Sequence, residues 1–185
     1  TLIDSAKDIH TGVTAVLPHG GNLFRNKVMA ACSVINGFGK SIGLLQVQEL
    51  GTIETPILLT NTMSIGTAYT ALCKYMLEQN SDIGVSTGTV NCLVTECNDG
   101  TLNDIRGMHV QESDVRSAIE AAGSDFAEGC VGSGGGMCCL GLKGGIGSAS
   151  RLCQLYGAQY TVRALVMPNF GAPGNLVIGG RHYDT

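Results

Sequence analysis

The pattern of apolar and polar positions predicts a chain of short strands with two helices between them. Between residues 64 and 79, apolar residues recur at steps of three and four, which is typical of an amphipathic helix. A second helix is predicted from Ser113 to Ala122, with Ser113 as its N-cap, Asp114 in its first turn and Gly123 after its end.

Apolar or β-branched runs that are bounded by turn residues predict the strands. These runs cover residues 12–18, 29–35, 57–60 and 159–167. A polar segment, 43–48, is also predicted to be a strand. The second run ends at Asn36-Gly37, a dipeptide typical of a tight turn, and charged turn residues occupy 96–100. Because the helices lie between strands and no fixed period repeats, the sequence predicts a layered α/β or α+β sandwich.

Glycine is the most unusual feature of the composition. It supplies 27 of the 185 residues, where about 7 % is usual. Many of these glycines lie between residues 129 and 151, where apolar residues such as Val131, Met137 and Leu140 stand among them. The interleaving predicts closely packed strands and turns in this segment, since a flexible linker would be polar.

The charge of the chain excludes two classes of partner. With 11 basic and 15 acidic residues the net charge is -4, so there is no basic surface for nucleic acid or for an anionic membrane. No apolar stretch approaches the roughly 18 residues of a membrane span. Only 14 % of the residues are charged, against about 25 % in a typical domain, which suggests that another polypeptide covers part of the surface.

The eight cysteines are expected to be free thiols, because most of them lie in apolar runs and a chain of this length needs no covalent cross-links. No CxxC pair exists and the four histidines are scattered, so we expect no metal and no cofactor. Reduced thiols favour a cytoplasmic protein. A cysteine nucleophile stays open as an alternative, since Cys97 follows Glu96 in a polar segment.

Two glycine-rich motifs resemble nucleotide-binding loops, but each lacks a glycine that the motif requires. Gly39-Lys40-Ser41 matches the end of a P-loop, but Val34 stands where the first glycine of that motif belongs. In the stretch that begins at Gly132, Met137 takes the place of the last glycine of a dinucleotide fingerprint, and no long helix follows.

The remaining candidates for chemistry are small polar residues at strand ends beside glycines. An asparagine side chain can donate to a developing oxyanion, and glycine lets backbone amides approach a ligand. The alternative is that these residues only make turns. The candidates are Asn36, Asn61, Thr62, Glu96, Asn98, Ser133 and Asn169.

Longer blocks of the sequence resemble one enzyme family, the DmpA-type L-aminopeptidase/D-esterases, which include the β-peptidyl aminopeptidases. The blocks follow one another in order and cover nearly all of the chain. They are residues 11–24 (TGVTAVLPHGGNLF), 35–62, 75–91, 96–107 (ECNDGTLNDIRG), 129–151 and 160–171 (YTVRALVMPNFG).

The resemblance implies an α+β fold, a four-layer αββα sandwich of the DmpA/ornithine-acetyltransferase type. It also implies a precursor that cuts itself into a larger α chain and a smaller β chain, whose new N-terminal Ser or Thr is the nucleophile. Residues 1–185 would then be a single domain forming most of the α chain, incomplete at both ends. Thr1 would be an interior position of the precursor and not the nucleophile.

The resemblance also implies roles for individual residues. Asn169 corresponds to the asparagine that stabilises the oxyanion, and Glu96 to the acidic residue that pairs with the free amino group of the substrate. Asn61 and the backbone of Gly134, Gly135, Gly136 and Met137 would line the same cleft. Thr101 stands where many relatives carry an aromatic residue, a departure that leaves substrate preference open.

The expected function is therefore the α-chain part of a hydrolase that removes N-terminal residues from small peptides, amides or esters through an acyl-enzyme. We expect the isolated chain to be inactive, and the enzyme to be a homo-oligomer of αβ pairs. Two alternatives remain open: an acyltransferase of the ornithine-acetyltransferase type, and a fragment without catalytic function.

Overall fold

The structure is a computed structural model that describes residues 1–183. Its α-helices are α1 (Leu44–Leu50), α2 (Ile65–Gln79) and α3 (Glu112–Glu120). The strands of the first half are β1 (Leu2–Asp4), β2 (Ile9–Thr11), β3 (Thr14–Val16), β4 (Val28–Met29), β5 (Thr52–Ile53), β6 (Ile57–Asn61) and β7 (Leu93–Cys97). The strands of the second half are β8 (Cys138–Cys139), β9 (Leu142–Lys143), β10 (Gly147–Leu155), β11 (Ala158–Val166), β12 (Leu176–Ile178) and β13 (Arg181–Tyr183).

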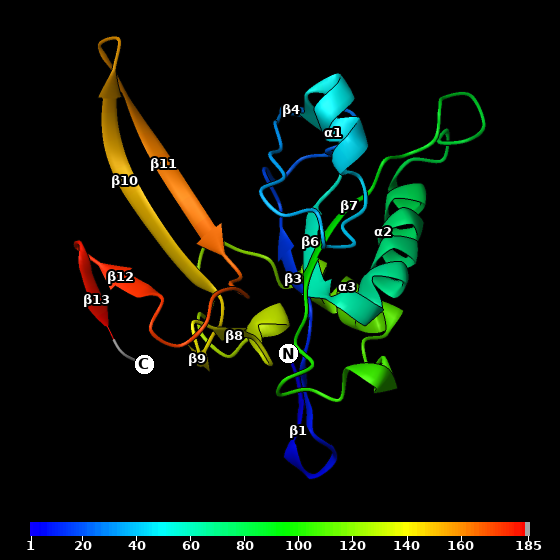
Figure 1. The fold of residues 1–185 in the computed structure, drawn as a ribbon. Helices are drawn as coiled ribbons and strands as arrows, with labels where there is room; N and C mark the ends of the chain where they lie inside the picture. The colour runs from blue at the N-terminus through cyan, green and yellow to red at the C-terminus, as the bar shows by residue number, and fades with distance from the viewer. Residues whose placement is uncertain (184–185) are drawn as a thin grey trace.

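A three-stranded sheet of order β3-β6-β7 forms the centre of the molecule (Figure 1). β3 runs antiparallel to β6, and β6 runs parallel to β7. Helix α2 packs against β6 and β7, while α3 packs against β3 and α2. The carboxyl ends of β6 and β7 therefore lie side by side, with Thr60 opposite Glu96 and Asn61 opposite Cys97.

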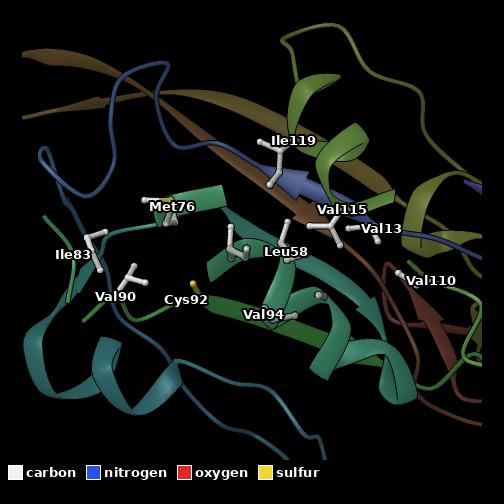
Figure 2. Close-up of a cluster of buried hydrophobic side chains, with 13 residues drawn as sticks. Val13, Leu58, Met76, Ile83, Val90, Cys92, Val94, Val110, Val115 and Ile119 are labelled. Carbon is white, nitrogen blue, oxygen red and sulfur yellow. The ribbon is translucent and has the colours of Figure 1, made fainter. Parts of the chain in front are cut away.

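The hydrophobic core fills the space between this sheet and the two helices (Figure 2). Leu58 and Leu72 are both fully buried there, one on β6 and one on α2. The periodicity that predicts α2 is the cause, since Ala68, Leu72 and Met76 face the sheet at steps of four. The buried members of the core are Val13, Leu58, Ala68, Ala71, Leu72, Met76, Ile83, Val90, Cys92, Val94, Val110, Val115 and Ile119.

A long hairpin of β10 and β11 stands on the opposite side of the sheet from α2 (Figure 1). Its two strands form a sheet of their own within the described residues. The register places Leu155, Tyr160, Val162 and Val166 on one face of the hairpin, and each of them is at least half exposed. Leu152 is exposed on the other face. An isolated two-stranded ribbon is marginally stable in water, and an exposed apolar face is typical of an interaction surface.

The pattern-based predictions for several elements are confirmed. Helix α2 begins directly after Ser64 and ends at Gln79. β6 covers the run at 57–60, β11 covers nearly all of 159–167, and β3 lies within 12–18. The predicted α+β character is also confirmed, because the chain combines helices with a mainly antiparallel set of strands.

Two predicted strands are wrong. In the segment 43–48, residues 44–48 belong to helix α1, whose N-cap is Gly43 and whose C-cap is Gly51, both in the left-handed region at φ 91° and 64°. Six residues are too few to separate the two periods. Leu44 and Val47 are three positions apart, which is also the spacing of apolar residues on one face of a helix. In the predicted strand 29–35 only Met29 belongs to a strand, and Ile35 is 99 % exposed, so this apolar run lacks the burial that a strand pattern implies.

Two local boundaries also differ. Helix α3 is capped by Gln111 and not by Ser113, because Asp114 accepts a hydrogen bond from the Gln111 N–H at 2.8 Å in a capping box. The same helix ends at Glu120, before Gly123. Glu96 and Cys97, which the sequence assigns to a turn, are the last two residues of β7, and the turn begins at Asn98.

Candidate active site

Glu96 lies near the end of β7 and its carboxylate is held from two sides. Its Oε1 accepts a hydrogen bond from the backbone N–H of Lys40 at 2.7 Å, and its Oε2 accepts one from the hydroxyl of Thr62. Gly39 allows this approach, since a Cβ there would lie 3.2 Å from Glu96 Oε1. The two hydrogen bonds fix the orientation of Glu96. Because a carboxylate offers about four acceptor positions, Glu96 can still accept bonds from a ligand.

Asn169 lies beside the turn that follows β7. Its Nδ2 donates a hydrogen bond to the backbone carbonyl of Asn98 at 2.7 Å, and the Cys97 thiol donates to the carbonyl of Met167 at 3.5 Å. The two contacts attach residues 167–169 to the segment that carries Glu96. Because an asparagine amide has two N–H donors, fixing one of them sets the direction of the other. The structure thus brings Glu96 and Asn169 to the same end of the sheet.

A buried polar network lies directly behind this turn. Asp99 is fully buried; its Oδ2 accepts from the Thr11 hydroxyl at 2.7 Å and its Oδ1 from the Asn103 amide at 3.0 Å. Burial raises the pKa of Asp99, and the two hydrogen bonds oppose part of that rise. Thr11 in turn accepts from Asn61 Nδ2 at 2.7 Å. Asn61 is therefore occupied inside the protein: it is 1 % exposed, and its Oδ1 accepts from the Ser64 N–H.

The glycine-rich segment Gly134 to Met137 packs behind the same network and is buried throughout. A Cβ on Gly136 would lie 2.3 Å from the His10 carbonyl and 3.0 Å from Asp99 Cβ, so only glycine fits there. The N–H groups of Gly134, Gly135 and Met137 donate to the carbonyls of Val131, Gly132 and Gly134, respectively. The ammonium of Lys143 donates to the carbonyls of Gly134 and Met137. Close packing of the glycines is thus observed, while these three amides are engaged within the protein.

The described residues also hold two larger cavities. One, of about 780 Å³, lies between β3, the α3 segment and the base of the hairpin, and the other, of about 800 Å³, lies beside Lys7, His10, Thr101 and Gly135. Neither cavity is lined by Glu96 or Asn169. In residues 1–183 no three His, Cys, Asp or Glu side chains are grouped so that they could hold a metal ion. Over the same residues, no helix is both long enough and apolar enough to cross a bilayer.

The whole sequence, residues 1–185, matches the model of one protein family, Peptidase family S58. The chain belongs to peptidase family S58. A similar curated protein is the beta-peptidyl aminopeptidase BapA of Sphingosinicella microcystinivorans, 39 % identical over 173 residues, which are 93 % of this chain and 42 % of that protein. The chain thus spans less than half the length of this curated relative.

Solved structures of similar proteins agree with the S58 assignment. The PH0078 protein from Pyrococcus horikoshii OT3 matches with a TM-score of 0.92 and 57 % identity, over 97 % of this chain and 51 % of that one. The L-aminopeptidase D-Ala-esterase/amidase from Ochrobactrum anthropi, described as a variant of the Ntn-hydrolase fold, matches with a TM-score of 0.74 and 32 % identity, over 95 % of this chain and 45 % of that one. The S58 chain is thus an α+β structure that matches part of this Ntn-hydrolase fold.

The sequence does not reveal several neighbours of the candidate site residues. The Lys40 N–H belongs to the segment that only resembles a P-loop; its position next to Glu96 depends on a contact 56 residues apart. The sequence places Asp99 in a turn, and its partner Thr11 lies 88 residues away along the chain. Local periodicity carries no information on such pairs.

The alternative of a cysteine nucleophile is disfavoured in the S58 chain. Burial, reinforced by the neighbouring charge of Glu96, raises the pKa of Cys97 to about 11. The thiol is therefore protonated at neutral pH, whereas a thiolate is the nucleophilic form. Thr1 lies beside the glycine-rich segment, where its hydroxyl accepts a hydrogen bond from the Gly132 N–H at 2.7 Å.

Proposed function

We propose that this chain is the α-chain part of a self-processing aminopeptidase. In this proposal the complete enzyme hydrolyses N-terminal residues of small peptides, amides or esters through an acyl-enzyme, formed on a Ser or Thr outside the chain. The observation that carries the proposal is the juxtaposition at the end of β7: a carboxylate held at Glu96, and an amide held at Asn169 against the carbonyl of Asn98. Membership of family S58 and the names of its relatives support it.

Glu96 would select substrates that have a free amino group. The N–H of Lys40 and the hydroxyl of Thr62 hold the carboxylate without neutralising it, since both donors are uncharged at the contact. The oxygen positions that remain can accept hydrogen bonds from a substrate ammonium. Such charge-assisted bonds are about twice as strong as neutral ones, which accounts for selectivity toward N-terminal residues.

Asn169 would contact the carbonyl oxygen of the scissile bond. The Nδ2–H that is not bound to Asn98 would donate to the carbonyl oxygen of the substrate as negative charge develops on it. The hydroxyl of the nucleophile attacks the carbonyl carbon, its proton passes to the nucleophile's own α-amine, and the leaving amine takes up that proton. Water then attacks the acyl-enzyme by the same steps and releases the acid.

The rest of the enzyme would cover the exposed surfaces of this chain. The apolar face of the β10–β11 hairpin and the run at 29–35 are among the apolar surfaces that are exposed in residues 1–183. A second sheet laid on the central sheet and hairpin would complete the four-layer αββα sandwich and bring the nucleophile to Glu96 and Asn169. The relatives are about twice as long as this chain, so they contain enough residues for such a half.

The proposal is tested by assaying the complete protein on alanine p-nitroanilide, with and without an amine acceptor. Release of free alanine as the main product is expected in both conditions, whereas dominant transfer to the acceptor would favour the acyltransferase alternative. The isolated 185-residue chain should show no turnover. Turnover by that chain, abolished in the Thr1→Ala variant, would contradict the assignment of the nucleophile to the rest of the protein.

A further inference from the structure

The turn after β7 connects the two proposed functional groups, and a single buried side chain anchors it. Glu96 precedes the turn, the carbonyl of Asn98 within it binds Asn169, and Asp99 follows immediately. The Asn98 side chain also accepts from the Gly100 N–H at 2.8 Å, which closes the turn locally. The direction of the Asn98 carbonyl therefore depends on what holds the next residue, Asp99.

Asp99 is held from three other parts of the chain. Thr11 on β2 donates to one carboxylate oxygen, and Asn103 donates to the other. Thr11 is itself tied to the end of β6 by the amide of Asn61, and Gly136 packs against Asp99 Cβ with no room for a side chain. Three segments, at Thr11, Asn103 and Gly136, thus meet at Asp99, whose side chain is fully buried and cannot reach a ligand directly.

We propose that Asp99 is a positioning residue for acyl transfer. It holds the Asn98–Asp99 peptide so that the Asn98 carbonyl binds one N–H of Asn169, which directs the second N–H toward the acyl oxygen. The inference rests on the role of Asn169 in the proposed function and deepens it. It also gives the Thr11 hydroxyl and the Asn61 amide a purpose: they link Asp99 to β2 and to the end of β6.

The first test is the Asp99→Asn variant of the complete enzyme. The variant keeps the size of the side chain, but the amide can no longer accept bonds on both sides, so the Thr11 hydroxyl or the Asn103 amide loses its acceptor. We expect kcat to fall by at least about 10-fold with KM nearly unchanged, bounded by the 100- to 1000-fold loss that removing an oxyanion donor causes. Asp104→Asn, an exposed carboxylate in the same loop, is the matched control and should leave kcat unchanged.

A double-mutant cycle separates positioning from a structural role. If Asp99 acts through Asn169, the Asp99→Asn change should cost nothing further in an Asn169→Ala enzyme, whereas independent effects multiply. Multiplying effects would overturn this inference alone. An Asn169→Ala enzyme with unchanged kcat would instead remove the proposed role of Asn169, and this inference with it.

Variants of Thr11 keep the inference testable if Asp99→Asn does not fold. Thr11→Ser retains the hydroxyl that donates to Asp99, and Thr11→Val removes it at nearly constant volume. We expect kcat to be close to that of the wild type for the serine variant and clearly lower for the valine variant. Equal kcat values for the two variants would overturn the inference.

Discussion

The proposed contact between Glu96 and the substrate's amino group predicts a selective loss in the Glu96→Gln variant. The amide is isosteric with the carboxylate. Its oxygen can still accept from the Lys40 N–H, and its NH₂ group can donate to the Thr62 hydroxyl oxygen. The substitution therefore removes the negative charge while it preserves the local hydrogen bonds.

The size of the loss follows from the contacts of Glu96. The Lys40 N–H and the Thr62 hydroxyl occupy one acceptor position on each oxygen, so about two of the four positions remain for an ammonium group. A hydrogen bond to a charged group contributes about 1.5–3 kcal/mol. Losing it should lower kcat/KM by about 10- to 150-fold, mainly through KM, because the bond is present both before and during the reaction.

The assay compares two substrates of similar size with the complete enzyme. Alanine p-nitroanilide carries the free amine, and propionyl p-nitroanilide is the same compound without the amino group. Glu96→Gln should lower kcat/KM for the first substrate and leave that for the second nearly unchanged. Glu120→Gln, which removes the same charge at an exposed position of α3, is the control and should change neither. Equal losses on both substrates would refute amine recognition by Glu96.

Two further predictions concern stability. Leu58→Ala, at a fully buried core position, should lower the free energy of unfolding by about 2–5 kcal/mol in chemical denaturation, and Leu77→Ala, at a position that is 46 % exposed, should cost clearly less. Burial acts to raise the pKa of Glu54, but hydrogen bonds from Lys27 and Asn91 outweigh it and the pKa lies below its ordinary value of 4.5. The folded state therefore binds fewer protons, so the stability from this group is present above pH 4.5 and is lost as pH falls below it. The free energy of unfolding, measured by chemical denaturation at several pH values below 4.5, should depend less steeply on pH in Glu54→Gln than in the wild type. An equal dependence in the two proteins would contradict this.

The sequence predicts the parts of the fold that depend on long periodic segments. Helix α2 follows from apolar steps of three and four, and β11 from a clean β-branched run. The segment 43–48 is too short for its period to separate a strand from a helix, and tertiary contacts at Gly43 decide the outcome: a Cβ there would lie 2.4 Å from the Cys92 carbonyl. The run at 29–35 is apolar, but the described residues do not bury it: Ile35 is 99 % exposed in residues 1–183, and only Met29 of the run belongs to a strand.

The candidate site, like the fold, is predicted only in part by the sequence. Composition and spacing alone predict only small polar residues beside glycines, and the roles of Glu96 and Asn169 come from the resemblance of longer blocks. The structure adds what neither source contains, because the contacts of Glu96 with Lys40 and of Asp99 with Thr11 join residues 56 and 88 positions apart. It also changes the interpretation of Asn61, which lies buried in the supporting network.

The central claim is that the nucleophile is created by self-cleavage in a part of the enzyme that lies outside this chain. Intact mass measurement and N-terminal sequencing of the purified complete protein test it directly. We predict two chains in equal amounts: a larger one that contains these 185 residues, and a smaller one that begins with Ser or Thr. A single uncleaved polypeptide with full aminopeptidase activity would contradict the account.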